Sequence, residues 1–149
     1  MLLNLVLGLS IMLLCLLLQI MLLLTAMRYY RRREQLLPDT PSFSSSLSAI
    51  GSIMLLLVLG NLIQIAIWGI LFLYLGEFSN FSEAFYHSAV NFATLGYGDL
   101  VMSGKHRLLG PLESVNGILM IGLSTSALMS ALQNTMRRTL KPRGDHPDS

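Results

Sequence analysis

The centre of this sequence reads Thr94-Leu95-Gly96-Tyr97-Gly98-Asp99. Its two glycines lack the β-carbon that restricts other residues, so the backbone can turn successive carbonyls toward one side. A strip of aligned carbonyl oxygens is a cation site, and four strips around one axis form stacked oxygen rings that replace an ion's hydration shell. The Thr94 hydroxyl is available as a further, innermost ring. We expect the side chains of Leu95 and Tyr97 to point away from that axis.

Apolar segments of membrane length lie on both sides of this stretch. The chain is 53% hydrophobic and only 12% charged, which is not the composition of a soluble domain. Non-helical backbone at membrane depth is tolerated only where it is buried in protein or lines a water-filled cavity. The six residues are therefore predicted to occupy such a place.

Three apolar runs predict an all-α membrane protein with three transmembrane helices, at residues 2–27, 47–75 and 111–136. The first run corresponds to ~39 Å of helix at 1.5 Å per residue, enough to span the hydrocarbon with some tilt. The first two runs are joined by a basic linker at 28–46, which two prolines interrupt. The third run is followed by a short basic tail at 137–149, which is expected to be disordered. Eight of the ten basic residues fall in these two segments. By the positive-inside rule both are cytoplasmic, which places the N-terminus outside a plasma (inner) membrane.

A short helix is predicted at residues 81–92, directly before the central stretch. Asn80 and Glu83 resemble a capping box at its start. The helix is too short to span a membrane, so it is expected to be re-entrant. Its C-terminal end would present a negative dipole and unpaired carbonyls to a central cavity.

Residues 94–99 resemble the T-V-G-Y-G-D signature of potassium channels, and Ser79 to Gln133 resembles their pore helix, selectivity filter and inner helix. The similarity covers residues 47–136 and implies a homotetramer that passes K⁺ passively, without a cofactor. The implied K⁺ ligands are Thr94, Leu95, Gly96, Tyr97 and Gly98. Two positions depart from the pattern: Leu95 replaces the usual valine, and Ala93 stands where many members carry a second threonine.

The resemblance also marks residues that would support the filter. Tyr86 and His87 stand where potassium channels carry paired tryptophans on the pore helix. Asp99 is expected either to face the ion path or to reach back to His87, whose titration would then alter filter support. Glu113, expected in the first turn of the inner helix, suits the helix dipole there. A salt bridge from Glu113 to Lys105 or Arg107 is the alternative.

The inner helix carries further candidates. Gly122 matches the position of the hinge glycine in potassium channels, although close packing is the commoner reason for a glycine in a membrane helix. Leu123, Ser126 and Ser130 share one helical face and are expected to line the cavity below the filter.

Polar and aromatic residues of the first two spans are interpreted as structural. The amides of Asn61 and Gln64 lie on one helical face and are expected to bind neighbouring helices. Trp68 and Tyr74 are expected to anchor the outer membrane interface. Cys15, the single cysteine, is interpreted as a small apolar packing residue.

Several function classes remain to be weighed. The sequence has no nucleophile-base pair, phosphate loop or metal-ligand cluster, so an enzyme is not expected. The basic blocks abut membrane spans, which favours contacts with anionic lipid over nucleic acid. Besides a potassium channel, two alternatives stay open: a weakly selective or nonselective cation channel, and a non-conducting scaffold or accessory subunit that retains the motif.

Overall fold

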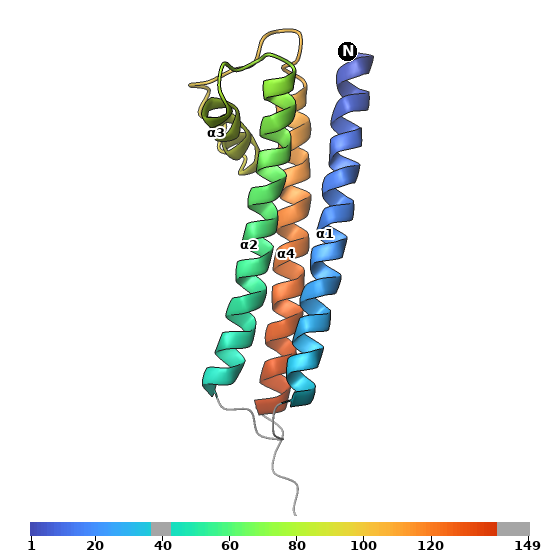
Figure 1. Cartoon of the computed structure of the whole chain (residues 1–149), viewed down its shortest axis with the longest axis vertical. Helices are drawn as coiled ribbons and strands as arrows, with labels where there is room; N and C mark the ends of the chain where they lie inside the picture. Colours follow the sequence, from blue (N-terminus) through green and yellow to red (C-terminus); the bar gives the residue numbers. More distant parts are fainter. Residues whose placement is uncertain (37–42, 140–149) are drawn as a thin grey trace, which may run out of the picture.

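The computed structural model describes residues 1–36 and 43–139. These residues form α1 (Leu2–Leu36), α2 (Phe43–Tyr74), α3 (Phe81–Phe92) and α4 (Leu109–Thr139), as Figure 1 shows. The three long helices contain apolar segments able to cross a membrane, at Leu2–Tyr29, Leu47–Tyr74 and Leu109–Arg137. The described residues thus confirm an all-helical protein with three candidate spans and a short helix between the second and third.

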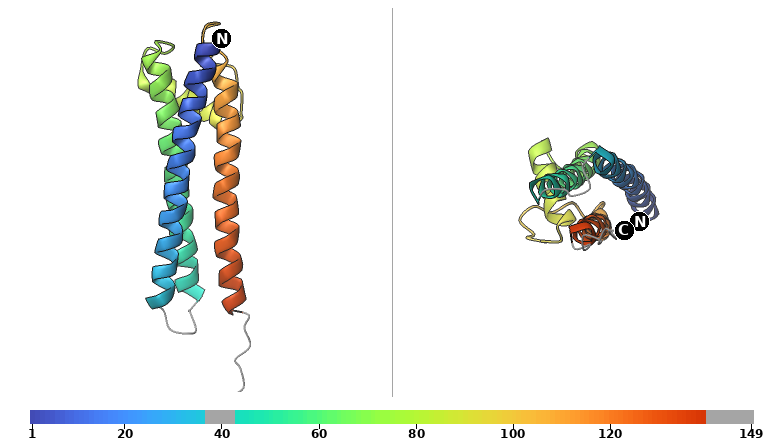
Figure 2. Two further views of the ribbon diagram at one scale, coloured as in Figure 1. Left: turned by 90° about the vertical axis from the view of Figure 1, so that its right-hand side faces the viewer. Right: turned by 90° about the horizontal axis from the view of Figure 1, so that it is seen from below.

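The long helices run side by side, and α3 lies at one end of the bundle. Both α1 and α3 pack against α2 and α4, but on different sides of that pair (Figures 1 and 2). The helix α1 therefore lies on the side of the α2–α4 pair away from α3. The short helix and the chain that follows it are held by α2 and α4.

The first helix extends past its membrane span. The span was predicted to end at Met27 and the candidate span ends at Tyr29, but α1 continues through the basic residues to Leu36. Arginine, glutamate, glutamine and leucine are good helix formers, and the first proline comes only at position 38. The predicted linker is correspondingly shorter. Its prolines, and the tail from residue 140, lie outside the described residues.

A buried hydrogen-bond chain joins the three long helices near the middle of their candidate membrane spans. Gln64 Nε2 on α2 donates to Gln19 Oε1 on α1, and Gln19 Nε2 donates to the Ser124 hydroxyl on α4, both over 2.8 Å. Both glutamines are fully buried. Gln64 therefore binds a neighbouring helix, as its sequence position predicts, and its partner Gln19 fixes α1 against the other two helices.

Trp68 corrects another expectation. It was predicted to lie at the membrane interface, but it is fully buried, with its ring centroid 5.9 Å from that of Phe72. The two rings belong to a core with Cys15, Ala84 and Leu109. The reason is that α1 covers the face of α2 that would otherwise meet lipid. Tyr74, one turn and a half further, does remain exposed.

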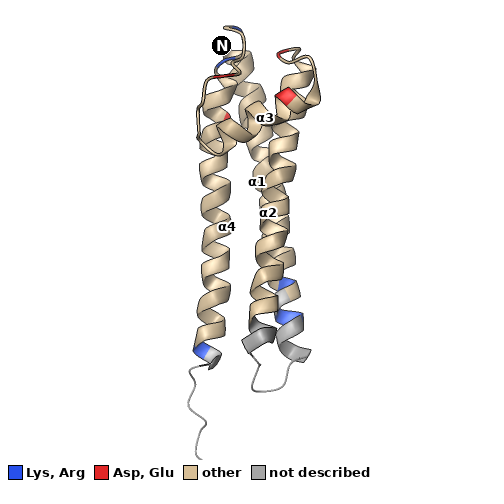
Figure 3. Cartoon of the chain, turned by 90° about the vertical axis from the view of Figure 1, so that its left-hand side faces the viewer, with Lys and Arg blue, Asp and Glu red and all other residues tan. Residues whose placement is uncertain are grey.

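The charged residues of the described chain gather at the two ends of the bundle (Figure 3). Arg28, Arg31, Arg32 and Arg137 are exposed at the end opposite α3. A long middle zone without charge separates them from the loops around α3. This distribution matches that of a multi-pass membrane protein.

Candidate functional site

The short helix α3 begins and ends with its backbone groups paired. The Asn80 side chain accepts a hydrogen bond from the Glu83 amide at 2.9 Å, which is one half of the predicted capping box. At the other end, the Thr94 amide donates to the Asn91 carbonyl and the Leu95 amide to the Val90 carbonyl, each at 2.9 Å. The carbonyls predicted to be unpaired at this end are thus largely satisfied by the chain that follows.

The backbone of the central stretch alternates in handedness. Thr94, Gly96 and Gly98 have φ values of 59°, 60° and 74°, whereas Leu95 and Tyr97 do not adopt positive φ. A β-branched residue such as Thr94 rarely occupies this left-handed region, so the surrounding structure must impose it. The positive φ values of Gly96 and Gly98 are conformations that their lack of a β-carbon permits.

Residues 93–99 are all exposed on the single chain. Leu95 and Tyr97 expose 53% and 65% of their surface although both are large and apolar or aromatic. These side chains do not pack into the protomer's own core. Apolar exposure of this kind marks surface that another protein can cover.

Two side chains of α3 hold the segment that follows the central stretch. The Tyr86 hydroxyl donates to Asp99 Oδ2 at 2.8 Å, and this bond lowers the pKa of Asp99 while raising the pKa of Tyr86. His87 Nδ1 lies 2.9 Å from the Leu100 carbonyl. A carbonyl can only accept, so the ring nitrogen donates. The positions equivalent to the tryptophan pair are therefore both engaged.

The expected contact between Asp99 and His87 is not the one the structure contains. Asp99 bonds to Tyr86, one residue earlier on the helix, because Asp99 and Tyr86 are both exposed while His87 is turned inward. His87 Nε2 accepts from the Asn91 amide at 2.9 Å. Burial lowers the pKa of His87, which fits this neutral ring with one donor and one acceptor.

A further set of hydrogen bonds, made by Glu77, was not predicted from the sequence. Glu77, just after α2, accepts from the Ser103 backbone and hydroxyl at 2.6 and 2.7 Å, and it contacts His106 Nδ1 at 2.5 Å. Burial disfavours ionisation of Glu77, but these hydrogen bonds outweigh it and hold its pKa below the ordinary value. The network fixes the loop after the central stretch to the turn before α3. No local pattern signals it, because the partners are 26 and 29 residues apart.

Glu113 also departs from expectation. The helix α4 begins at Leu109, so Glu113 lies beyond its first turn, and it forms no bond to Lys105 or Arg107 among the described residues. Instead it is fully buried, with Oε1 hydrogen bonded to the Ser88 hydroxyl of α3. Glu113 thus forms a contact between α4 and α3, not between α4 and the loop that contains Lys105 and Arg107.

The inner helix meets α3 at Gly117. A β-carbon at this position would lie 2.0 Å from the Phe92 carbonyl oxygen, so only glycine permits the approach. Gly122, in contrast, has open space around it within an unbroken helix. The candidate cavity residues are exposed along α4: Leu123, Ser126 and Ser130.

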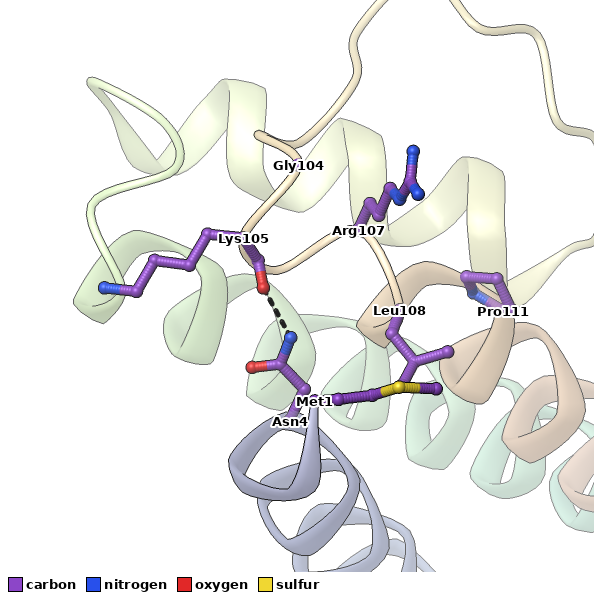
Figure 4. A pocket seen from close by; sticks show the side chains of 7 residues that line it. All are labelled: Met1, Asn4, Gly104, Lys105, Arg107, Leu108 and Pro111. Carbon is purple, nitrogen blue, oxygen red and sulfur yellow. Dashed lines mark hydrogen bonds between the residues drawn. The ribbon is translucent and has the colours of Figure 1, made fainter.

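A hollow of about 460 Å³ lies at the N-terminal end of α1, between its first turn and the loop before α4. The Asn4 amide donates to the Lys105 carbonyl beside it, as Figure 4 shows. This bond fixes the start of α1 to the loop before α4. None of the predicted site residues lines the hollow.

The described residues contain no group of three or more side chains suited to hold a metal ion. No curated protein and no solved structure matches the chain. The family model described as "Ion channel" matches residues 57–134, which include α3, the central stretch and most of α2 and α4. The chain is therefore not an enzyme, and it belongs to the ion channel family.

Proposed function

We propose that the protein is a passive, potassium-selective channel formed by four copies of this chain. The observation that carries this proposal is the alternating backbone of residues 94–98, with positive φ at every second residue. In this arrangement the carbonyls of Thr94, Leu95, Gly96 and Tyr97 replace the hydration shell of K⁺, together with the Thr94 hydroxyl.

Four copies follow from the geometry of one strip. A single carbonyl strip offers oxygens from one side only, so closed symmetry is needed to surround an ion. The exposed side chains of Leu95 and Tyr97 supply surface for the neighbouring copies. The pore module then comprises residues 47–136, with α1 outside it.

The proposed ion path includes a hinge and a cavity on α4. Gly122 is the candidate hinge, and Leu123, Ser126 and Ser130 face the cavity below the filter. The exposed arginines at the end opposite α3 support a cytoplasmic location for that end, in contact with anionic lipids, with the N-terminus outside.

The test is ion flux through purified protein in liposomes under a K⁺ gradient, with Na⁺-only vesicles alongside. A Gly96→Ala variant carries a β-carbon at φ 60° and should lose the flux, because left-handed backbone strains residues with side chains. Gly104→Ala is the matched control, since a β-carbon there meets open space without positive φ. K⁺ flux that is lost only in Gly96→Ala supports the proposal.

Two other results would replace it. Equal flux of Na⁺ and K⁺ would favour a weakly selective cation channel, in keeping with Leu95 and Ala93. An absence of flux, together with a tetramer that binds no ions, would favour a non-conducting scaffold.

A further inference from the structure

Glu113 is a carboxyl group packed inside the membrane-spanning part of the molecule. It is fully buried, and its second oxygen, Oε2, has no hydrogen-bond partner among the described residues. Among the described residues, the contact within salt-bridge distance joins Glu77 to His106, and none pairs Glu113 with a basic side chain. A buried carboxylate without a cation is strongly disfavoured.

The helices around Glu113 supply no charge to balance it. The span of α2 contains no Asp, Glu, Lys or Arg between residues 47 and 74. On α1, residues 2–27 likewise contain no Asp, Glu, Lys or Arg. On α3, His87 is already engaged by Leu100 and Asn91. Each neighbouring helix therefore leaves Glu113 in neutral surroundings.

The number of protons available at the Ser88 hydroxyl indicates the protonation state of Glu113. The Ser88 oxygen is hydrogen bonded both to Glu113 Oε1 and, at 2.7 Å, to the Ile65 carbonyl of α2. A serine hydroxyl has one proton, and a backbone carbonyl can only accept. If Ser88 donates to Ile65, the second contact needs a proton from Glu113. An ionised Glu113 would instead place two acceptors around a single donor.

We infer that Glu113 is a neutral carboxylic acid that donates to Ser88 and thereby acts as a positioning residue for α3. The resulting chain of donors runs from Glu113 on α4 through Ser88 on α3 to the Ile65 carbonyl on α2. It pins the middle of α3 to both helices that flank it. Buried hydrogen bonds that join three helices in this way restrain the movement of one helix against another.

The position of α3 matters because the filter stretch starts on it. The Thr94 and Leu95 amides bond to carbonyls of its last turn. A shift of α3 is therefore passed directly to residues 94 and 95. The consequence for ion flow rests on the proposed function, whereas the protonation of Glu113 does not.

Infrared difference spectroscopy tests the protonation state without any need for flux. At neutral pH the wild-type protein should show the C=O stretch of a protonated carboxylic acid. Glu113→Gln should remove this band, and Ser88→Ala should shift it to higher frequency by removing the acceptor of the proton. Glu83→Gln, at a half-buried site near the start of α3, is the matched control and should leave it unchanged.

Backbone amide exchange of α3 tests the positioning role, again independently of flux. Glu113→Ala removes the donor, and exchange in α3 should rise about tenfold, as expected for one lost buried hydrogen bond. Glu113→Gln keeps a neutral donor at the same place and should retain near wild-type exchange. Should Glu113→Ala fail to fold, Ser88→Ala breaks the same chain and should show the same rise.

The outcomes separate this inference from the proposed function. No protonated-acid band at neutral pH, or a band that survives Glu113→Gln, would refute the neutral acid. Unchanged α3 exchange in both alanine variants would refute the positioning role. Wild-type protein that carries no K⁺ flux yet shows the band and the exchange pattern would instead refute the channel and retain the inference.

Discussion

Gly117→Ala is the substitution for which the structure sets the sharpest expectation. The added β-carbon would lie 2.0 Å from the Phe92 carbonyl oxygen and 2.8 Å from its carbon. Real β-carbons essentially never approach other heavy atoms closer than 3.0 Å, so α4 and the end of α3 must separate by about 1 Å. The obstructing atoms belong to the backbone, and no side-chain rotation can relieve the contact.

The magnitude follows from two opposing terms. Overpacking in a well-packed region costs about 1–3 kcal/mol, and a backbone obstruction belongs at the upper end. Replacing glycine by alanine inside a helix stabilises the folded protein by up to about 1 kcal/mol, through higher helix propensity. Gly117→Ala should therefore lose about 2 kcal/mol. In Gly122→Ala the new β-carbon meets open space, so this variant gains helix propensity without any overpacking. It should therefore be more stable than Gly117→Ala by about 3 kcal/mol.

Reversible unfolding of the purified variants in detergent, followed by circular dichroism, measures this difference. Gly117→Ala should also disturb ion selectivity, because Phe92 lies two residues before Thr94. Gly122→Ala should keep selectivity and change only opening, if Gly122 is the hinge. Equal stability of the two variants would refute the packing of α4 on α3 described above.

Three further substitutions test separate contacts. Gln19→Leu should cost about 1–2 kcal/mol of unfolding free energy, since it breaks both bonds of the buried chain that joins the long helices; a neutral effect in unfolding experiments would contradict that chain. Tyr86→Phe should raise the pH at which acid reduces flux, because Asp99 loses the bond that lowers its pKa. Tyr74→Phe, at an exposed site, should leave that pH profile unchanged. Because the pKa of Glu77 is lowered in the folded protein, its contribution to stability is present above the ordinary value of 4.5 and is lost as the pH falls through the folded value. Glu77→Gln should raise amide exchange of the loop after the filter already at neutral pH, and unchanged exchange would count against the network.

The spans and the short helix could be predicted from the sequence because they depend on local properties. Hydropathy over a membrane-length window marks each long helix, and Asn80 caps α3 through a contact only three residues away. The positive φ values of Gly96 and Gly98 could likewise be predicted, because glycine has no side chain to oppose them. These features need no knowledge of which helix packs on which.

The features that were wrong or missed depend on contacts between distant segments. Trp68 is buried only because α1 covers it, and the hydropathy of α2 says nothing about that cover. Glu113 meets Ser88 across 25 residues, and Glu77 meets His106 across 29. A carboxylate near a helix start resembles a dipole cap in sequence, whether it faces solvent or a neighbouring helix.

The proposal that this chain forms a potassium channel is tested most directly by the reversal potential of purified wild-type protein in planar bilayers. K⁺ is placed on one side and Na⁺ on the other, at equal concentrations. A carbonyl filter built from residues 94–98 predicts a large shift of the reversal potential toward the K⁺ equilibrium. A steady current that reverses near zero would contradict the claim, since both ions would then pass equally well.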